Sequence, residues 1–484
     1  MGDRRSEGIG NGGAGVAVAN DATASYWNPA AFGFFKNPEG GGDYGERNWS
    51  IQLFDVGVGA QSHEDFAVFL SDISKFDFTL LSGAAIPLNK VSDFIQLLDT
   101  LKTFDSNQNR ALTILGNAGL RTQFGHFGIG GFATLDVTAR GDLDLVNISP
   151  TSTMTTFTID DFTNPANYNC PAPCNTDTPG GLDTTQRAAL DAFLTDPAGL
   201  AWTGGPGGQA TNFINAIDNG LASLPAGTTI PPDIVTQIEN VATLANTAAS
   251  SGGTFANNTS TIQFKGIGIA EFPLTYGLAL SDDLAIGGNI KFMKARVYNT
   301  VVKLFNTDFN NALDLALDDF VESEDFGVDI GFLYRLGDSL RFGIVGRNLN
   351  SPEFDMKKVL ATDPDHLEEK PQVRAGLAYK PASFITLAAD IDLAKNETTV
   401  GNDFESQTVG AGVEFTLKII QLRAGAFQNL AEDDIGLVYT AGLGINLWLL
   451  NFDIGAALSK DSTEIDGDDI PEEARVEFAL SMLF

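Results

Sequence analysis

The chain ends on Val476-Glu477-Phe478-Ala479-Leu480-Ser481-Met482-Leu483-Phe484, in which apolar side chains alternate with small or polar ones. Successive residues of a β-strand face opposite sides, so one side carries an apolar stripe made of Val476, Phe478, Leu480, Met482 and Phe484. The other side carries Arg475, Glu477 and Ser481. One face suits lipid and the other water, which predicts the last strand of a membrane β-barrel.

The composition excludes several other classes of protein. The chain has 62 acidic and 29 basic residues among 484, a net charge of -33, which argues against a nucleic-acid partner. No apolar run approaches the roughly 20 residues of a spanning helix. Mean hydropathy is close to zero, as expected when half of each strand faces water.

Fourteen segments are predicted as strands because apolar alternation in them is bounded by turn residues. They are residues 50–60, 117–125, 128–140, 262–280, 284–304, 324–335, 339–349, 371–380, 384–394, 406–416, 419–428, 436–447, 450–459 and 475–484. From the second strand on, every other link is a tight turn and the intervening links are long. This alternation predicts an antiparallel up-and-down outer-membrane barrel.

The same alternation predicts the orientation of the chain. The tight turns and the C-terminus are expected on the periplasmic side of a Gram-negative outer membrane, and the long loops outside. Residues 61–116 are predicted as the first extracellular loop and 141–261 as a large extracellular insertion. Because Met1 to Ser6 is charged and polar, we expect a mature form with an added or initiating methionine.

Charged residues on the face opposite the apolar stripe are predicted to point into the lumen, because lipid-facing Arg or Lys costs about 2 to 4 kcal/mol at the midplane. Strand positions opposed across a turn are expected to pair Arg374 with Asp390 and Glu414 with Arg423. These charges either rigidify the barrel or form a substrate path. The set is Arg121, Lys265, Glu271, Asp329, Arg341, Arg347, Arg374, Asp390, Asp392, Glu414, Arg423, Asp453, Arg475 and Glu477.

The long loops contain helical patterns. Residues 92–101 place apolar side chains on one helical face, and Phe309, Leu313 and Leu317 do the same in a later loop. Asp183-Thr184-Thr185-Gln186 predicts a capping box, and two further short helices are expected at 213–221 and 234–244. Such helices must pack on each other, on a partner or, as we expect, over the barrel mouth.

Neither a cofactor nor a metal site is predicted. Cys170 and Cys174 lack nearby histidines, so an exported disulfide is favoured over a free pair. The three histidines stand far apart, and the acidic stretch 461–469 has no known calcium-loop spacing, which favours solvation over calcium binding.

The N-terminal stretch 8–31 is rich in glycine and small residues and includes Tyr26-Trp27-Asn28-Pro29-Ala30. It resembles the N-terminal plug of the FadL-type long-chain fatty acid transporters. The resemblance implies a plug at residues 1–49 and a barrel at 50–484.

A second resemblance concerns the TraF-like outer-membrane family named for plasmid transfer operons. It is carried by Val345-Gly346-Arg347-Asn348-Leu349-Asn350-Ser351-Pro352-Glu353-Phe354, by the segment from Pro371 to Tyr379 with 387–393, and by 421–425. It implies a FadL-like plugged barrel.

Two functions follow, and enzymatic activity is not expected. The first is passive uptake of a small hydrophobic, fatty-acid-like molecule, in which plug aromatics either bind the ligand or merely seal the plug. The residues concerned are Tyr26, Trp27, Asn28, Pro29, Phe32, Phe34 and Phe35. The second is a non-transporting surface barrel whose loops dock a partner protein, a filament or a second copy, because the insertion greatly exceeds ordinary loop length.

Overall fold

A computed structural model describes residues 10, 12–34, 49–76, 91–105, 110–147, 180–205, 207–222, 224, 230–251, 257–304, 319–361, 363–397, 405–432, 434–447, 449–465 and 467–483. Within these residues, fourteen antiparallel strands close into one barrel. They are β1 (Trp49–His63), β2 (Ala111–Phe124), β3 (Phe127–Asp142), β4 (Thr261–Ala279), β5 (Leu284–Lys303), β6 (Phe320–Leu336), β7 (Leu340–Arg347), β10 (Gln372–Ala382), β11 (Ile385–Asp392), β14 (Thr408–Leu417), β15 (Ile420–Asn429), β16 (Val438–Leu447), β17 (Leu450–Ser459) and β20 (Glu473–Leu483). The predicted fold class is confirmed.

Closure depends on the terminal strand. β20 pairs with β17 on one side and with β1 on the other, so Val56 lies opposite Phe478 and Gly57 opposite Glu477. Phe478 is 49% exposed on the outside, whereas Glu477 is fully buried inside. The predicted division into an apolar and a polar face therefore holds in this strand, although Phe484 itself lies outside the described residues.

The outward apolar band has a visible limit on β5 and β6. Ile290 and Phe292 are exposed on the outer face of β5, and the next outward residue is Lys294. The Lys294 Nζ lies 3.2 Å from a carboxylate oxygen of Glu322, and Arg296 Nε lies 2.8 Å from the other. Because a lipid environment disfavours such charges, the membrane-facing band ends between Phe292 and Lys294.

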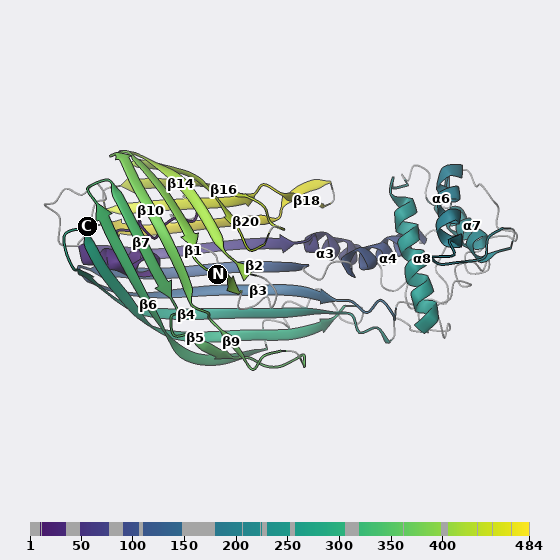
Figure 1. The fold of residues 1–484 in the computed structure, drawn as a ribbon, viewed down its shortest axis with the longest axis horizontal. Helices are drawn as coiled ribbons and strands as arrows, with labels where there is room; N and C mark the ends of the chain where they lie inside the picture. Colours follow the sequence, from purple (N-terminus) through teal and green to yellow (C-terminus); the bar gives the residue numbers. More distant parts are fainter. Residues whose placement is uncertain are drawn as a thin grey trace.

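Strands β1 to β5 extend far beyond this limit and end near a group of helices (Figure 1). From Phe292 to Lys303, β5 continues for roughly 35 Å at about 3.3 Å per residue. The helices, here called the helical lobe, are α3 (Phe66–Lys75), α4 (Val91–Asp105), α6 (Thr184–Thr195), α7 (Gln209–Ala222) and α8 (Ile234–Ser251). None of the helices in the described ranges combines the length and the apolar character needed to cross a membrane.

The helical lobe has its own hydrophobic core. Leu98, Leu190, Phe213 and Ile238 are buried in one cluster that also includes Ile262 at the start of β4. At the start of α6, Asp183 Oδ1 accepts from the N–H groups of Thr185 and Gln186, and Gln186 Oε1 accepts from Asp183 N. The predicted helices at 92–101, 183 onward, 213–221 and 234–244 are thus present. They pack on each other and on the strand ends, while the expected helix around Phe309 lies outside the described residues.

Three small two-stranded sheets were not predicted. They are β8 (Glu353–Asp355) with β9 (His366–Glu368), β12 (Asn396–Glu397) with β13 (Glu405–Ser406), and β18 (Ser462–Ile465) with β19 (Asp468–Pro471). Strands of two to four residues are too short to show a reliable period. The acidic stretch 461–469 belongs to the third sheet, where the Thr463 hydroxyl donates to Asp65 Oδ1 at 2.6 Å.

Candidate functional site at the N-terminal segment

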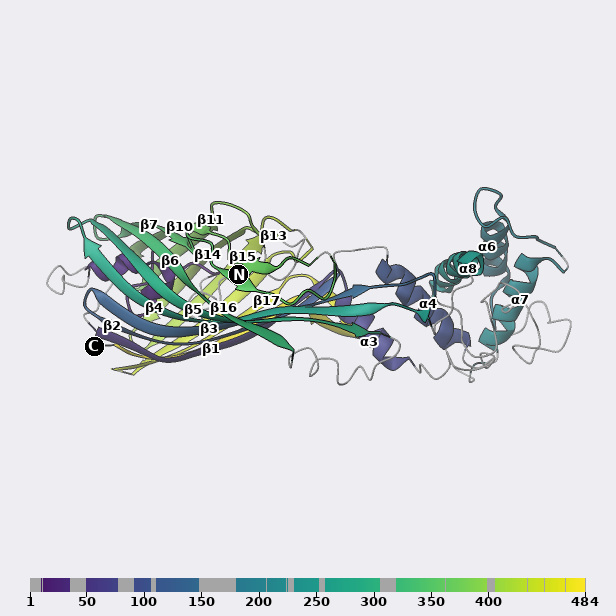
Figure 2. The same cartoon turned by 90° about the horizontal axis from the view of Figure 1, so that it is seen from below.

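Residues 12–34, here called the N-terminal segment, contact inward-facing positions of the barrel wall. The segment contains α2 (Ala24–Trp27) and the 3-10 helix η1 (Pro29–Phe34), and parts of it are visible among the barrel strands in Figure 2. A Cβ on Gly287 of β5 would lie 2.3 Å from Pro29 O, and one on Gly331 of β6 would lie 2.1 Å from Asn28 Oδ1. Glycine in the wall is therefore required for the segment to come this close.

Asp390 of β11 holds the start of the segment. One carboxylate oxygen, Oδ2, accepts from Gly15 N at 2.8 Å and from Val16 N at 2.9 Å. Asp390 is 4% exposed, and Val16 is 1% exposed. Hydrogen bonds to a charged acceptor are stronger than neutral ones, so this contact is a firm attachment to the wall.

Asn28 holds the middle of the segment. Its Nδ2 donates to Val16 O at 3.3 Å and to Phe332 O of β6 at 2.9 Å. Its Oδ1 accepts from Ala30 N at 3.1 Å, which closes the turn around Pro29. The Asn-Pro pair thus links two parts of the segment to each other and to the barrel.

The predicted plug aromatics are largely buried. Trp27 is 1% exposed and meets Tyr26 edge to face at 5.5 Å between ring centroids, while Phe32 is fully buried. A Cβ on Gly128 of β3 would lie 2.3 Å from Phe32 Cε2, so this ring packs directly on the wall. The Arg335 guanidinium lies over the Phe34 ring at 3.4 Å. Phe35 lies outside the described residues.

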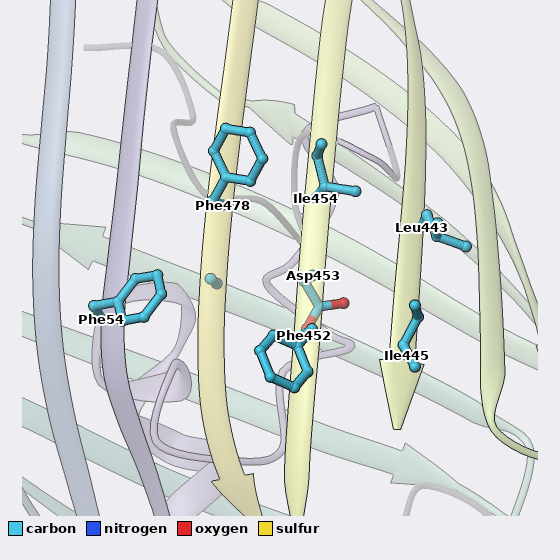
Figure 3. Close-up of a pocket in the computed structure, with 8 residues that line it drawn as sticks. Phe54, Leu443, Ile445, Phe452, Asp453, Ile454 and Phe478 are labelled. Atoms are coloured by element: carbon cyan, nitrogen blue, oxygen red, sulfur yellow. The ribbon is translucent and has the colours of Figure 1, made fainter. Parts of the chain in front are cut away.

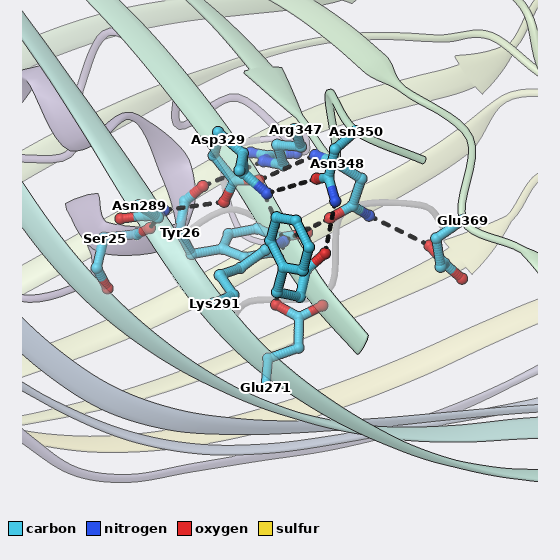
Figure 4. Close-up of polar contacts among 12 residues, drawn as sticks. Ser25, Tyr26, Glu271, Asn289, Lys291, Asp329, Arg347, Asn348, Asn350 and Glu369 are labelled. Carbon is cyan, nitrogen blue, oxygen red and sulfur yellow. Dashed lines mark hydrogen bonds and ion pairs between the residues drawn. The ribbon is translucent and has the colours of Figure 1, made fainter. Parts of the chain in front are cut away.

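A polar cluster surrounds Tyr26 (Figure 4). Lys291 Nζ lies 3.4 Å from Glu271 Oε2 and 3.1 Å from Asp329 Oδ1, and it donates to Asn348 Oδ1 at 2.6 Å. Arg347 Nε donates to Tyr26 O at 3.1 Å, and its guanidinium lies over the Tyr26 ring at 4.3 Å. A lysine and an arginine thus share the cluster with two carboxylates.

This cluster connects the N-terminal segment to the wall through Asn289. Asn289 Nδ2 donates to Ser25 O at 2.7 Å and to Asp329 Oδ2 at 2.9 Å. A cavity of about 50 Å³ lies between Tyr26 and the Lys291 cluster. This volume and its polar lining suit one or two water molecules better than an apolar ligand.

The remaining predicted lumen charges join wall strands to one another. Arg423 Nε lies 2.7 Å from Glu414 Oε2, and its Nη1 lies 2.6 Å from Asp453 Oδ1. Glu477 likewise contacts Asn117 of β2 at 3.2 Å, whereas Arg475 pairs with Glu473 of its own strand at 2.5 Å and Lys265 lies 3.9 Å from Asp363 in the segment between β8 and β9. Arg341 is 2% exposed.

One predicted pair is wrong. Arg374 lies opposite Asp392, with Nε 2.7 Å from Asp392 Oδ1, whereas Asp390 lies opposite Gly376. The turn lies between Ala382 and Ile385 and not around Pro381, and a one-residue register shift follows between Tyr379 and Ala382, so the pairing is displaced by two residues from the expected one. This shift leaves Asp390 facing the N-terminal segment.

The predicted set of lumen residues omits two buried polar residues of β1, Gln52 and Asp55. An extra residue in β1 shifts its register with both β2 and β20 near Leu53, so Leu53 and Phe54 are both exposed outside. The bulge turns both Gln52 and Asp55 inward, where each accepts from the fully buried Arg121, the aspartate at 3.0 Å. Strict alternation would place residues 52 and 55 on opposite faces.

The outer face near this bulge carries an apolar groove of about 250 Å³ (Figure 3). Phe54 of β1 and Phe478 of β20 line it together with Leu443, Ile445, Phe452 and Ile454 of β16 and β17. These side chains are 37–49% exposed. The groove therefore lies on the membrane-facing surface.

The predicted cysteine pair, Cys170 and Cys174, lies outside the described residues. Of the histidines, His63 at the end of β1 has its Nδ1 2.5 Å from Asp434 Oδ2. Burial opposes charge on Asp434, but the His63 contact and backbone N–H groups outweigh it and lower the pKa of this carboxyl. No grouping of His, Cys, Asp and Glu suited to a metal occurs in the described part of the chain.

These features define a class: a membrane-spanning β-barrel with an apolar outer band, whose lumen receives the chain's own N-terminal segment. Closed barrels of this kind belong to bacterial outer membranes. Residues 194–392 match the family described as "F plasmid transfer operon, TraF, protein". The resemblance to the TraF-like family is thus confirmed over this part of the chain. No curated protein matches the chain.

Similar solved structures include hydrocarbon channels. A TodX deltaS2S3 mutant monoaromatic hydrocarbon channel is 11% identical, with a TM-score of 0.45 and coverage of 99% of this chain and 98% of that chain. The toluene transporter TbuX of Ralstonia pickettii is 10% identical, with a TM-score of 0.44 and coverage of 100% and 99%. A FadL homologue of Pseudomonas aeruginosa is 10% identical, with a TM-score of 0.41 and coverage of 99% and 98%.

Proposed function

We propose that this protein takes up small hydrophobic molecules passively across the outer membrane, and that the N-terminal segment is the plug that controls passage. The observation that carries the proposal is the attachment of this segment to inward-facing wall residues, above all Asp390 and Asn28. Each attachment is a set of hydrogen bonds, which can break and re-form without unfolding the barrel. A plug held in this way can rearrange.

The proposed ligand class is apolar and fatty-acid-like. Tyr26 and Trp27 form the aromatic centre of the segment, and burial of apolar groups against such rings supplies binding energy. The outer groove beside the β1 bulge supports exit toward the membrane, because its lining is apolar and lies next to an irregular ladder. The ligand would then leave directly into lipid.

Binding of radiolabelled palmitate and toluene to the barrel in lipid nanodiscs tests this function. Wild type should bind at least one probe saturably, and Trp27→Ala should weaken the binding about tenfold by losing buried aromatic contact. Trp49→Ala is the matched control, since Trp49 is 54% exposed at the start of β1. Absence of saturable binding in wild type, or equal affinity in Trp27→Ala, would count against the proposal.

A second function, docking of a partner by the helical lobe, is supported by the lobe's separate hydrophobic core beyond the membrane-facing band. A core of this kind holds a defined surface away from the membrane. Deletion of residues 180–251, followed by pull-down and ligand uptake, separates the two. Lost partners with intact uptake would favour docking.

A further inference from the structure

The β8–β9 hairpin is amphipathic although each strand has only three residues. Phe354 lies opposite Leu367, and both are buried, at 0% and 4% exposure. Their strand neighbours Glu353, Asp355, His366 and Glu368 are all exposed. One face of the hairpin is therefore apolar and covered, while the other is charged and faces water.

The apolar face covers an inward-facing strip of the barrel wall. Phe354, Leu367 and the adjacent Met356 form one buried cluster with five wall residues, which are Ile267 and Ile269 of β4 and Met293, Ala295 and Val297 of β5. On β5, these positions begin beside Phe292, where the outer apolar band ends. The strip thus lies on the inner wall at the level where the apolar band of the outer face ends, next to Phe292.

An inner wall made of Ile, Met, Ala and Val is unusual in this lumen. Many other inward positions carry buried charges such as Arg121, Asp390 and Arg423, and the apolar ones at Leu333 and Val345 are covered by the N-terminal segment. Without the hairpin, the strip would be an apolar surface inside a polar barrel, which is costly in water. An apolar ligand could cover it as well as Phe354 and Leu367 do.

The hairpin is attached to the wall through individual hydrogen bonds, including those of Asn299 Nδ2 on β5 to Lys357 O at 2.9 Å and to Asp363 Oδ2 at 2.8 Å, and not through a strand ladder. It forms a sheet of its own and does not join the barrel ladder. Glu353 N donates to Asp325 Oδ2 at 2.9 Å, and Asp355 N donates to Ser323 Oγ at 3.1 Å, both on β6. An isolated two-stranded hairpin is at best marginally stable, so the packing of its apolar face matters for its position.

We propose that the strip formed by Ile267, Ile269, Met293, Ala295 and Val297 is a binding surface for an apolar chain, and that the β8–β9 hairpin occupies it until ligand displaces the hairpin. This inference rests on the proposed uptake of hydrophobic molecules and adds the place where the ligand first binds inside the barrel. Phe354 and Leu367 of the hairpin occupy the position that the ligand would take on the strip. The charged outer face of the hairpin keeps it hydrated when it moves away from the strip.

The test fixes the hairpin in place with a disulfide. In a background with Cys170→Ser and Cys174→Ser, the pair Ser323→Cys and Asp355→Cys joins the hairpin to β6 at its existing contact. The barrel in nanodiscs is exposed to a diazirine-bearing palmitate and light, and labelled peptides are mapped by mass spectrometry. In the reduced variant we expect labelling of β4 and β5 around Met293, and oxidation should lower it at least tenfold.

The matched control is the pair Glu353→Cys and Glu368→Cys, which lie directly opposite each other within the hairpin. This disulfide stiffens the hairpin without tying it to the wall, so oxidation should leave labelling unchanged. Equal labelling of Met293 peptides with the β6 disulfide open or closed would overturn the inference, even if palmitate binds elsewhere. A wild-type barrel that binds no palmitate or toluene would overturn the proposed function and this inference together.

Discussion

Replacement of Asp390 by alanine should release the N-terminal segment from the wall. The change removes the acceptor of Gly15 N and Val16 N, two hydrogen bonds of 2.8 and 2.9 Å to one carboxylate oxygen. Hydrogen bonds to charged groups contribute about 1.5 to 3 kcal/mol each, so the loss is about 3 to 6 kcal/mol. Since every 1.4 kcal/mol is about tenfold, the detached state should gain roughly a hundredfold to ten-thousandfold in population. Asp390→Asn keeps one acceptor oxygen and should show a smaller effect.

The assay follows the exposure of Ser25, which is 3% exposed and lies in α2. Ser25→Cys, made with Cys170→Ser and Cys174→Ser, should react slowly with a water-soluble maleimide, and Asp390→Ala should raise this rate at least thirtyfold. Single-channel recordings in planar bilayers should show new conductance in the same variant.

The control for this experiment is Asp392→Asn. Asp392 lies on the same inner face of β11, but its hydrogen bonds go to Arg374 and to Thr408 N on the wall. Asp392→Asn should leave the labelling of the cysteine at position 25 within about twofold of the parent, because the N-terminal segment keeps its contacts. If Asp390→Ala and Asp392→Asn give the same rate, Asp390 does not hold the segment and the reasoning fails.

Three further predictions concern separate parts of the molecule. Asn28→Ala should weaken the turn at Pro29 by about 3 kcal/mol, because it removes hydrogen bonds to Val16, Phe332 and Ala30; the measure is faster trypsin cleavage at Arg sites introduced nearby, and unchanged cleavage would contradict it. Because the pKa of Asp434 is lowered in the folded protein, its charged form contributes about 1 kcal/mol to folding stability above pH 5. This stabilisation is lost as the pH falls through the folded pKa, which lies below 3.8. Amide exchange at 434–437 should therefore quicken on acidification, and Asp434→Asn should remove this dependence. Asp218→Ala should destabilise the helical lobe by about 3 to 5 kcal/mol, because buried Asp218 accepts from Leu182 N and pairs with Arg187; proteolysis should then cut the lobe while the barrel strands stay uncut.

The sequence was sufficient to predict the barrel because one face of each wall strand contacts lipid and the other faces the polar lumen. Residues such as Phe478 and Glu477 must face opposite sides, and that requirement is local and periodic. The tight turns likewise leave a local signal. All fourteen strands could therefore be predicted, with boundaries that differ by up to six residues; the largest difference is at β2, which starts at Ala111 and so takes part of the predicted loop 61–116.

The contacts that hold the N-terminal segment could not be predicted in the same way. Asp390 was expected to face Arg374, but the β10–β11 turn lies later in the chain than expected, Arg374 pairs with Asp392, and Asp390 accepts from Gly15 and Val16. Gln52 faces inward only because of a bulge whose position leaves no periodic trace. The β8–β9 hairpin is too short for its alternation to stand out in sequence, although Phe354 is fully buried.

Apolar packing and hydrogen bonds hold both elements inside the barrel, but the exposed step for a ligand differs between them. The hairpin contacts the wall through Phe354, Met356 and Leu367, for which an apolar ligand competes directly, and through hydrogen bonds such as that of Glu353 N to Asp325. The N-terminal segment also packs Phe32 and Phe34 on the wall, but at Asp390 and Asn28 it is attached by hydrogen bonds, for which such a ligand offers no substitute.

Displacement of the hairpin can still affect the N-terminal segment, through hydrogen bonds that run by way of Asn348. This residue accepts from Lys291 and donates to Glu369 at the base of the hairpin, while the Lys291 partner Asp329 accepts from Asn289, which holds Ser25 O. A ligand that moves the hairpin therefore disturbs the same buried charges that position α2. On our proposals, hairpin displacement comes first and release of the plug follows, because an apolar ligand can replace the apolar contacts of the hairpin but not the hydrogen bonds at Asp390.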